Sequence, residues 1–131
     1  MTDPTLYRDD SRVRHMIVAM KRVLDVSNGM SRDELVGAEQ KTESILFNLT
    51  IIGEAANNIS KEFATKNPEV DWKSIAGVRH KIVHDNADID YDVIWRIVQD
   101  DIPGACAKLQ EIEKTLPPEP TEPPENMADF L

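Results

Sequence analysis

Residues 31–67 read SRDELVGAEQKTESILFNLTIIGEAANNISKEFATKN, and this stretch decides the fold. Its apolar and small side chains recur at steps of three and four, which places them on one face of an α-helix. Ser31 and Glu34 have the spacing of a capping box, and Pro68 disfavours a helical conformation at Asn67. We therefore predict one long helix that packs through a continuous seam. The seam residues are Leu35, Ala38, Thr42, Ile45, Leu49, Ile52, Ala56, Ile59 and Phe63.

Helical spacing continues on both sides of this stretch. Apolar residues recur at helical intervals through residues 6–24, and Asn28-Gly29 ends that run. A shorter helix is predicted over residues 71–83 and a longer one over residues 91–116. Pro103 removes a backbone donor from the latter and is expected to kink or split it. No segment has the alternation typical of a half-buried strand, so we predict an all-α helical bundle.

The length of 131 residues fits one domain, which we place at residues 1–116. Hydrophobic residues make up 40% of the chain and aromatic residues only 5%, so the core is expected to be aliphatic. Residues 117–131 are rich in proline and acidic residues and are predicted to form an extended, disordered tail. The apolar end of that tail, residues 127–131, either docks on a partner or on the body, or is a frayed terminus.

The formal net charge of −9 argues against a general binder of polyanions. However, four acidic residues lie in the tail, and residues 11–24 contain Arg12, Arg14, Lys21 and Arg22 without any acidic residue. This basic set is either a solvated helix face or a local RNA contact.

No apolar run approaches the length of a membrane span, and the N-terminus does not read as a secretory signal. Cys106 is the single cysteine and cannot form an internal disulfide. We therefore expect a reduced, cytoplasmic protein without membrane contact.

The octet RHKIVHDN at residues 79–86 carries the strongest chemical signal. Arg79 is a permanent cation that can bind a phosphate through two parallel hydrogen bonds. A histidine such as His84 can give and take a proton near neutral pH. On an unbroken helix the two residues would differ by about 140° of rotation and roughly 7.5 Å of rise. We expect them to converge because His84 lies at a frayed helix end and because two copies meet across a two-fold axis.

This pair suits cleavage of RNA without a metal or another cofactor. His84 would act as general base on a ribose 2′-hydroxyl, and Arg79 would stabilise the charge that grows on the phosphoryl oxygens. The products would be a 2′,3′-cyclic phosphate and a 5′-hydroxyl. His80 would either orient Arg79 or bind the phosphate. Alternatively His80 and His84 could bind zinc, with only Asp85 or Asp88 at hand as a further ligand.

Beyond this pair, the order and spacing of several residues are similar to those of one family. They are Ile52-Gly53-Glu54-Ala55, Pro68, Trp72, Ile75, Gly77, Arg79, His84, Ile89-Asp90 and Trp95. Through them the chain resembles the HepT-like toxins of the HEPN superfamily over roughly residues 6–116. The resemblance implies a HEPN-type bundle of four to five helices, with a short third helix that carries the R-x-x-x-x-H motif. It also implies a homodimer and metal-independent RNA cleavage by Arg79 and His84.

In the family, such a toxin is one half of a toxin–antitoxin pair of the type II/VII-like kind, and its partner is a minimal nucleotidyltransferase. Many of these toxins carry a tyrosine, two residues after the histidine, that the partner modifies. Asn86 stands at that position here, so we expect neutralisation by another route. The alternative function is a non-catalytic helical module that binds a nucleotidyltransferase or RNA.

Further residues are assigned supporting or scaffold roles. Asp85 and Asn86 flank the histidine and are candidate supporting residues. Glu54 is either a buried partner of Arg79 or a capped polar group in the bundle core.

We interpret four further residues as parts of the scaffold. His15 is a surface histidine and Cys106 is a small core residue. Trp72 and Trp95 are packing anchors.

Overall fold

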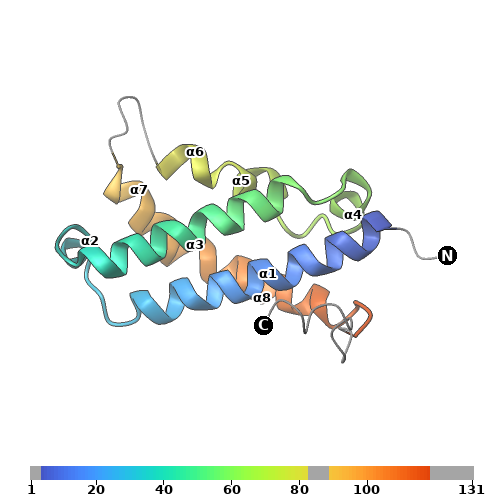
Figure 1. Ribbon diagram of the computed structural model, residues 1–131, viewed down its shortest axis with the longest axis horizontal. Coiled ribbons are helices and arrows are strands. Elements are labelled where there is room, and N and C mark those ends of the chain that lie inside the picture. Colours follow the sequence, from blue (N-terminus) through green and yellow to red (C-terminus); the bar gives the residue numbers. More distant parts are fainter. Residues whose placement is uncertain (1–3, 83–88, 119–131) are drawn as a thin grey trace, which may run out of the picture.

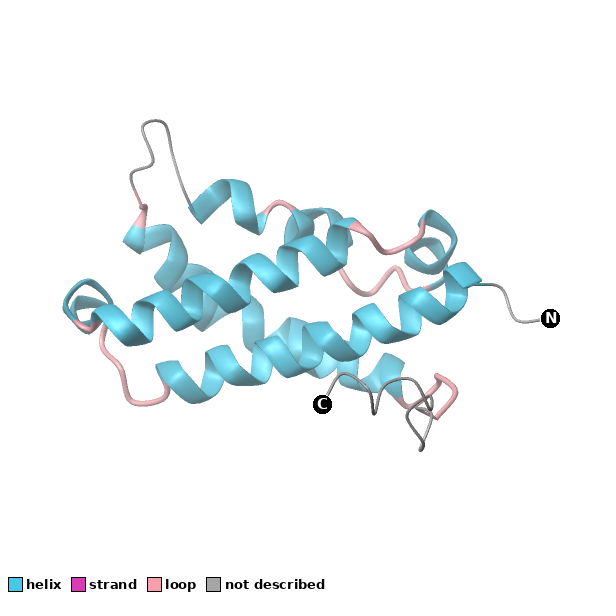
Figure 2. Cartoon of the chain, viewed as in Figure 1, coloured by secondary structure: helices cyan, strands magenta, loops and turns pink. Residues whose placement is uncertain are grey.

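The computed structural model describes residues 4–82 and 89–118, with side chains from Asp9 onward. Within these ranges the chain is helical and forms no β-strand, as Figure 2 shows, so the all-α prediction is confirmed. None of the described helices combines the length and apolarity that crossing a bilayer requires. In chain order the helices are α1 (Pro4–Ser27), α2 (Arg32–Gly37), α3 (Glu39–Asn57), α4 (Lys61–Lys66), α5 (Trp72–Ala76), α6 (Val78–Ile82), α7 (Tyr91–Arg96), the π-helix η2 (Ile97–Asp101) and α8 (Ile102–Glu113).

Two long antiparallel helices, α1 and α3, lie side by side and form one layer of the bundle (Figure 1). Helix α8 packs on α1, whereas α5 and α6 pack on α3. Helices α2 and α7 contact each other near the turn that leads from α1 into α3. The pair of long helices is therefore the scaffold on which the short helix α6, which carries Arg79, is positioned.

The core between these helices is mainly aliphatic, as the composition predicts. Met16 and Met20 of α1, Leu49 and Ile52 of α3 and Leu109 of α8 have no exposed surface. Burial of each such side chain contributes roughly 1.5–3 kcal/mol to folding. Every residue of the predicted seam over residues 31–67 is buried or packs partly buried against this core.

The prediction that residues 31–67 form one continuous helix is wrong, because the stretch forms α2, α3 and α4. The first break falls at Ala38, whose backbone has φ −93° and ψ 73°. The Thr42 hydroxyl donates to the Leu35 carbonyl, an acceptor that a continuous helix would have paired with a backbone N–H. Gly37 precedes the break and favours it, since glycine weakens a helix.

The second break, which separates α3 from α4, is stabilised by a contact with α1. Ser60 caps α4 by accepting a hydrogen bond of 3.1 Å from the Phe63 backbone N–H. The fully buried Asp9 carboxylate accepts from the Ser60 backbone N–H at 2.8 Å and from the Ser60 hydroxyl at 2.5 Å. Arg12 lies 3.9 Å from the same carboxylate. Because Asp9 and Ser60 are 51 positions apart, helical spacing within residues 31–67 does not reveal this contact.

Helix ends that depend on local turn residues agree with the predictions. Gly29, which follows α1, has φ +79°, a left-handed conformation that glycine adopts without strain. Ser31 caps α2 by accepting from the Glu34 backbone N–H at 3.3 Å. Helix α4 ends at Lys66, directly before Asn67-Pro68.

The two predicted C-terminal helices are subdivided. Residues 71–82 form α5 and α6 with Gly77 between them, and position 83 lies outside the described residues. Residues 91–113 form α7, η2 and α8 without a non-helical residue between them, so Pro103 does not split the helix, and the interruption is the π-helical segment directly before it. Pro103 lies in the first turn of α8, where its missing N–H needs no partner. In the π-helical segment η2 before it, the Ile102 N–H donates to the Ile97 carbonyl, five residues back.

The buried Asp9 carboxylate leads to a prediction about stability. Asp9→Ala leaves both Ser60 donors without their charged acceptor, and hydrogen bonds to charged groups contribute about 1.5–3 kcal/mol each. We expect the free energy of unfolding to fall by about 3 kcal/mol in urea denaturation. Asp25→Ala, at an exposed position of the same helix, is the control and should change it by less than about 0.5 kcal/mol. Equal effects of the two variants would contradict the role of Asp9.

Candidate active site

An acidic residue of α3 holds Arg79, which lies on α6. The guanidinium forms an ion pair with the Glu54 carboxylate through Nη1 and Oε1. The Arg79 side chain is 32% exposed and the Glu54 side chain 50% exposed. Glu54 is thus a partner of Arg79, but the prediction that this partner is buried is wrong, and its role in a site stays a prediction. Because the pair is open to solvent, an anionic ligand can compete with Glu54 for the guanidinium.

Close packing of α6 on α3 brings the two side chains together. Gly53 is buried in α3, and a Cβ atom there would lie 3.5 Å from the Arg79 backbone nitrogen and 3.6 Å from the Ala76 carbonyl oxygen. The backbone of α6 thus runs directly against α3 at this residue. Glu54 is the next residue along α3, so its carboxylate lies close to the Arg79 guanidinium.

One nitrogen of Arg79 is enclosed without a partner. Nε is buried and forms no hydrogen bond with any residue that the structure describes, whereas Nη1 binds Glu54. A buried donor without an acceptor costs about 1–3 kcal/mol. Arginine binds phosphate through two parallel N–H donors, and the Nε–H can serve as one of them once the side chain turns to present it to an anion beside Glu54.

The other predicted site residues are distributed as follows. His80 follows Arg79 on α6 and is exposed, and its side chain forms no hydrogen bond within the described part of the chain. Three predicted residues lie outside the described ranges: His84, Asp85 and Asn86. The convergence of the histidine with Arg79 therefore stays a prediction.

A pocket of about 270 Å³ lies between α5, α6 and the segment formed by η2 and α8. Its lining includes Lys81, Asp101 and Lys108 but neither Arg79 nor Glu54, so it is separate from the ion pair. Across residues 4–82 and 89–118, no three His, Cys, Asp or Glu side chains cluster in a way that could hold a metal ion.

Two groups with raised pKa values lie on the side of the bundle where α1 meets α8. Burial raises the pKa of the Asp10 carboxyl; Arg14 opposes this effect and Asp9 adds to it. Burial also raises the pKa of the Cys106 thiol, against the influence of Lys21. Both groups belong to the scaffold rather than to the site.

The residues interpreted as scaffold occupy the predicted places. His15 is exposed on α1 and Cys106 is buried on α8. Trp72 is 8% exposed and packs edge-to-face on Phe63, with ring centroids 5.9 Å apart. Trp95 packs against the core as a partly buried residue.

Three features of the structure were not predicted from the sequence. Asp9 is buried although an acidic residue in a helix usually faces solvent. Gly53 has a packing role that its place in the family-like segment around Glu54 does not reveal. Phe47 is 66% exposed. It lies outside the predicted seam, and that position was the one sign in the sequence that its side chain faces solvent.

Comparison with known proteins agrees with this architecture. Residues 16–112 match the family described as Ribonuclease HepT-like. The chain therefore belongs to the HepT-like family of the HEPN superfamily, as the sequence resemblance indicated.

The chain is similar to several proteins that are named as ribonucleases. "Putative RNase MJ0127" of Methanocaldococcus jannaschii is 34% identical over 97 residues, which cover 74% of this chain and 80% of the relative. "Putative RNase TTE0752" of Caldanaerobacter subterraneus subsp. tengcongensis is 32% identical over 100 residues, covering 76% and 89%. "Probable ribonuclease HepT" of Thermococcus cleftensis is 35% identical over 77 residues, covering 58% and 70%. No solved structure matches the chain. Ribonuclease activity is the function that family membership supports.

The close approach at Gly53 can be tested with two substitutions. Gly53→Ala adds a methyl group at ordinary contact distances, and alanine favours a helix by roughly 0.5–1 kcal/mol over glycine, so stability should not fall. Gly53→Leu must push α6 away from α3, and we expect a loss of about 1–3 kcal/mol in urea denaturation. If Gly53→Leu is as stable as Gly53→Ala, α6 does not pack against this residue.

Proposed function

We propose that this protein is a metal-independent endoribonuclease that cleaves RNA by attack of a ribose 2′-hydroxyl on the adjacent phosphorus. Membership of the HepT-like ribonuclease family supports the substrate class. The observation that carries the proposal is the ion pair between Glu54 and Arg79. It fixes a guanidinium at a solvent-open position, and Arg79 corresponds to the catalytic arginine that the family resemblance implies.

In the proposed reaction, His84 accepts the proton of the 2′-hydroxyl. The 2′ oxygen bonds to phosphorus while the bond between phosphorus and the 5′ oxygen breaks. The departing 5′ oxygen takes up a proton, so the products are a 2′,3′-cyclic phosphate and a 5′-hydroxyl. Arg79 stabilises the negative charge that develops on the phosphoryl oxygens. DNA lacks the nucleophile and is not a substrate.

The proposed active assembly is a homodimer in which the α6 helices of two copies face each other. The last turn of α6 carries Arg79, His80 and Lys81 in succession. Two such turns in one cleft would concentrate positive charge in an otherwise acidic protein and so attract an RNA backbone.

The proposed cellular role is that of a cytoplasmic toxin in a type II/VII-like toxin–antitoxin pair, with a minimal nucleotidyltransferase as the neutralising partner. Asn86 stands where the family often has the modified tyrosine. Neutralisation therefore takes a route other than tyrosine modification, and occlusion of the cleft by the partner is the simplest one.

Cleavage of RNA in EDTA tests this mechanism. Wild-type protein should cleave and leave 2′,3′-cyclic phosphate ends. Arg79→Ala and His84→Ala should each lower the rate by about 10²-fold or more, since each removes a group that acts on the reacting atoms. Lys73→Ala, at an exposed position of α5, is the matched control and should cleave as the wild type does.

Two outcomes would contradict the mechanism. Equal cleavage by all four proteins would mean that the activity comes from elsewhere, and cleavage that stops in EDTA would mean that a metal ion is required. If the wild type binds RNA without cutting it, the non-catalytic binding module becomes the correct function.

The positioning role of Glu54 can be separated from a purely structural one. Glu54→Ala frees the guanidinium to move, and misplacement of a catalytic group can lower the rate by about 10²-fold, so we expect kcat to fall roughly 10- to 100-fold. KM should not rise, because a competing anion has left the phosphate-binding group. Glu54→Gln keeps a hydrogen-bond acceptor and should restore part of kcat. A higher KM with unchanged kcat would contradict this role.

A further inference from the structure

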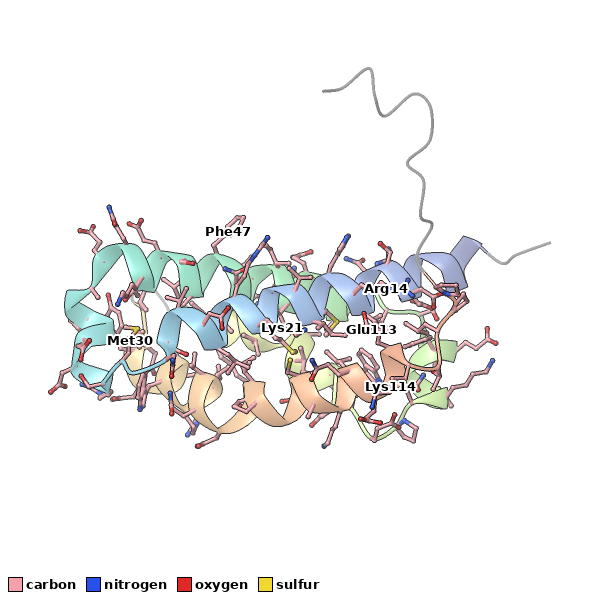
Figure 3. All side chains as sticks on the ribbon, turned by 90° about the horizontal axis from the view of Figure 1, so that it is seen from below. Arg14, Lys21, Met30, Phe47, Glu113 and Lys114 are labelled. Atoms are coloured by element: carbon pink, nitrogen blue, oxygen red, sulfur yellow. The ribbon has the colours of Figure 1, made fainter. Side chains whose placement is uncertain are left out.

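The outward face of the layer formed by α1 and α3 carries an exposed aromatic side chain. Phe47 of α3 is 66% exposed, in a chain where aromatic residues are scarce. In Figure 3 its side chain points away from the bundle, on the α3 side of α1. Val18 of α1 is also exposed, at 47%. This face therefore offers apolar contact area that the core does not use.

Helix α1 contributes basic side chains beside this face, although two of them lie toward α8, where Arg14 pairs with Glu113 and Lys21 influences the Cys106 thiol (Figure 3). We name Arg14, His15, Lys21 and Arg22 the α1 basic strip. The spacing of seven residues between Arg14 and Lys21, and between His15 and Arg22, stacks these side chains along the helix with exposed Val18 among them. Arg14 forms an ion pair with Glu113 of α8, in which Nε and Oε2 lie 3.9 Å apart.

The remaining side chains of the strip are available to a ligand. Lys21, Arg22 and His15 are exposed and form no ion pair with any residue in the described ranges. The nearest acidic residue along α1 is the exposed Asp25, one turn beyond Lys21 and Arg22, and it forms no ion pair with them. In a chain of net charge −9, such a strip is a local site for an anion rather than part of a general positive surface.

The strip and Phe47 lie within reach of the Arg79 site. Phe47 and Glu54 are seven residues apart on the exposed face of α3, which is about 10 Å along the helix. Packed helices such as α1 and α3 have axes roughly 8–10 Å apart. A chain bound at Arg79 can therefore pass over Phe47 and continue onto α1 within a few nucleotides.

We propose that Phe47 and the α1 basic strip bind single-stranded RNA that extends from the Arg79 site. This inference rests on the proposed ribonuclease function. The strip would bind phosphates, and the phenyl ring would stack on an unpaired base, which is how proteins commonly hold single-stranded RNA.

Charge favours RNA over a second copy of this chain as the occupant. A two-fold dimer through this face would press one basic strip directly against the other with no anion between them, unlike the proposed α6 cleft, which RNA fills, and like charges across an interface oppose association. A polyanion instead meets complementary charge. The opposite result, in which Phe47 mediates self-association, is one of the outcomes of the test below.

The test measures binding to a short single-stranded RNA with 2′-O-methyl groups throughout, in EDTA, by fluorescence anisotropy. Phe47→Ala should raise Kd roughly tenfold, the effect expected when one base no longer stacks. Arg22→Glu should raise Kd to a similar extent. It should also reduce the slope of log Kd against the logarithm of the salt concentration, by about 0.7 for each phosphate that the protein no longer neutralises.

Matched controls lie on other helices. Val36→Ala removes a side chain of α2 that is 55% exposed, and Lys108→Glu reverses an exposed charge on α8. Both should bind the RNA as the wild type does. Urea denaturation of each variant verifies that it is folded.

The outcomes separate this inference from the proposed catalytic function, because the 2′-O-methyl RNA cannot be cleaved. Binding that depends on Phe47 and Arg22 supports the inference even if the wild type fails to cut natural RNA. Wild-type Kd values for Phe47→Ala and Arg22→Glu overturn it, as does absence of RNA binding by the wild type. A lower molecular mass of Phe47→Ala by light scattering, with an unchanged Kd, also overturns it and identifies a second copy as the occupant.

Discussion

The packing of α6 against α3 at Gly53 is the contact on which the site depends. A helix of five residues is not stable alone in water, so α6 owes its position to its neighbours. Val78 and Ile82 are buried, whereas Arg79 between them reaches the surface. A small residue at position 53 lets the backbones approach, because anything larger than a methyl group would push α6 away, and Glu54 then holds the guanidinium.

Different parts of the molecule provide the stability of the fold and the groups of the candidate site. The aliphatic core between α1, α3 and α8 provides the free energy of folding, and the buried Asp9 joins α1 to the start of α4. The ion pair of Glu54 and Arg79 is solvent-open and adds little to stability. Arg79 can therefore leave Glu54 and pair with a phosphate while the fold stays intact. Positive charge is local in this acidic chain, on the last turn of α6 and along α1.

Local patterns predicted much of the fold. The spacing of apolar residues identified the helical segments and the seam, and Gly29 and Pro68 marked helix ends that the structure confirms. The breaks at Ala38 and before Ser60 were missed because the seam continues across them. Their causes are a side-chain hydrogen bond from Thr42 and a contact from distant Asp9, neither of which has a periodic signature.

For the candidate site, the structure tests only the geometry of two predicted residues. The types and order of its residues pointed to Arg79 and to Glu54 as its possible partner, and the structure joins them. The approach of α6 to Gly53 depends on the packing of two helices, which a single sequence does not encode at any one position. The exposure of Phe47 likewise depends on which side of α3 the neighbouring helices cover.

The central claim is that α3 holds the Arg79 guanidinium where it meets an RNA phosphate. The most direct measurement is the NMR signal of the Arg79 Nε–H group during titration with uncleavable RNA. This signal should shift as RNA binds, whereas that of exposed Arg96 on α7 should not. An Arg79 signal that stays unchanged at saturating RNA would contradict it.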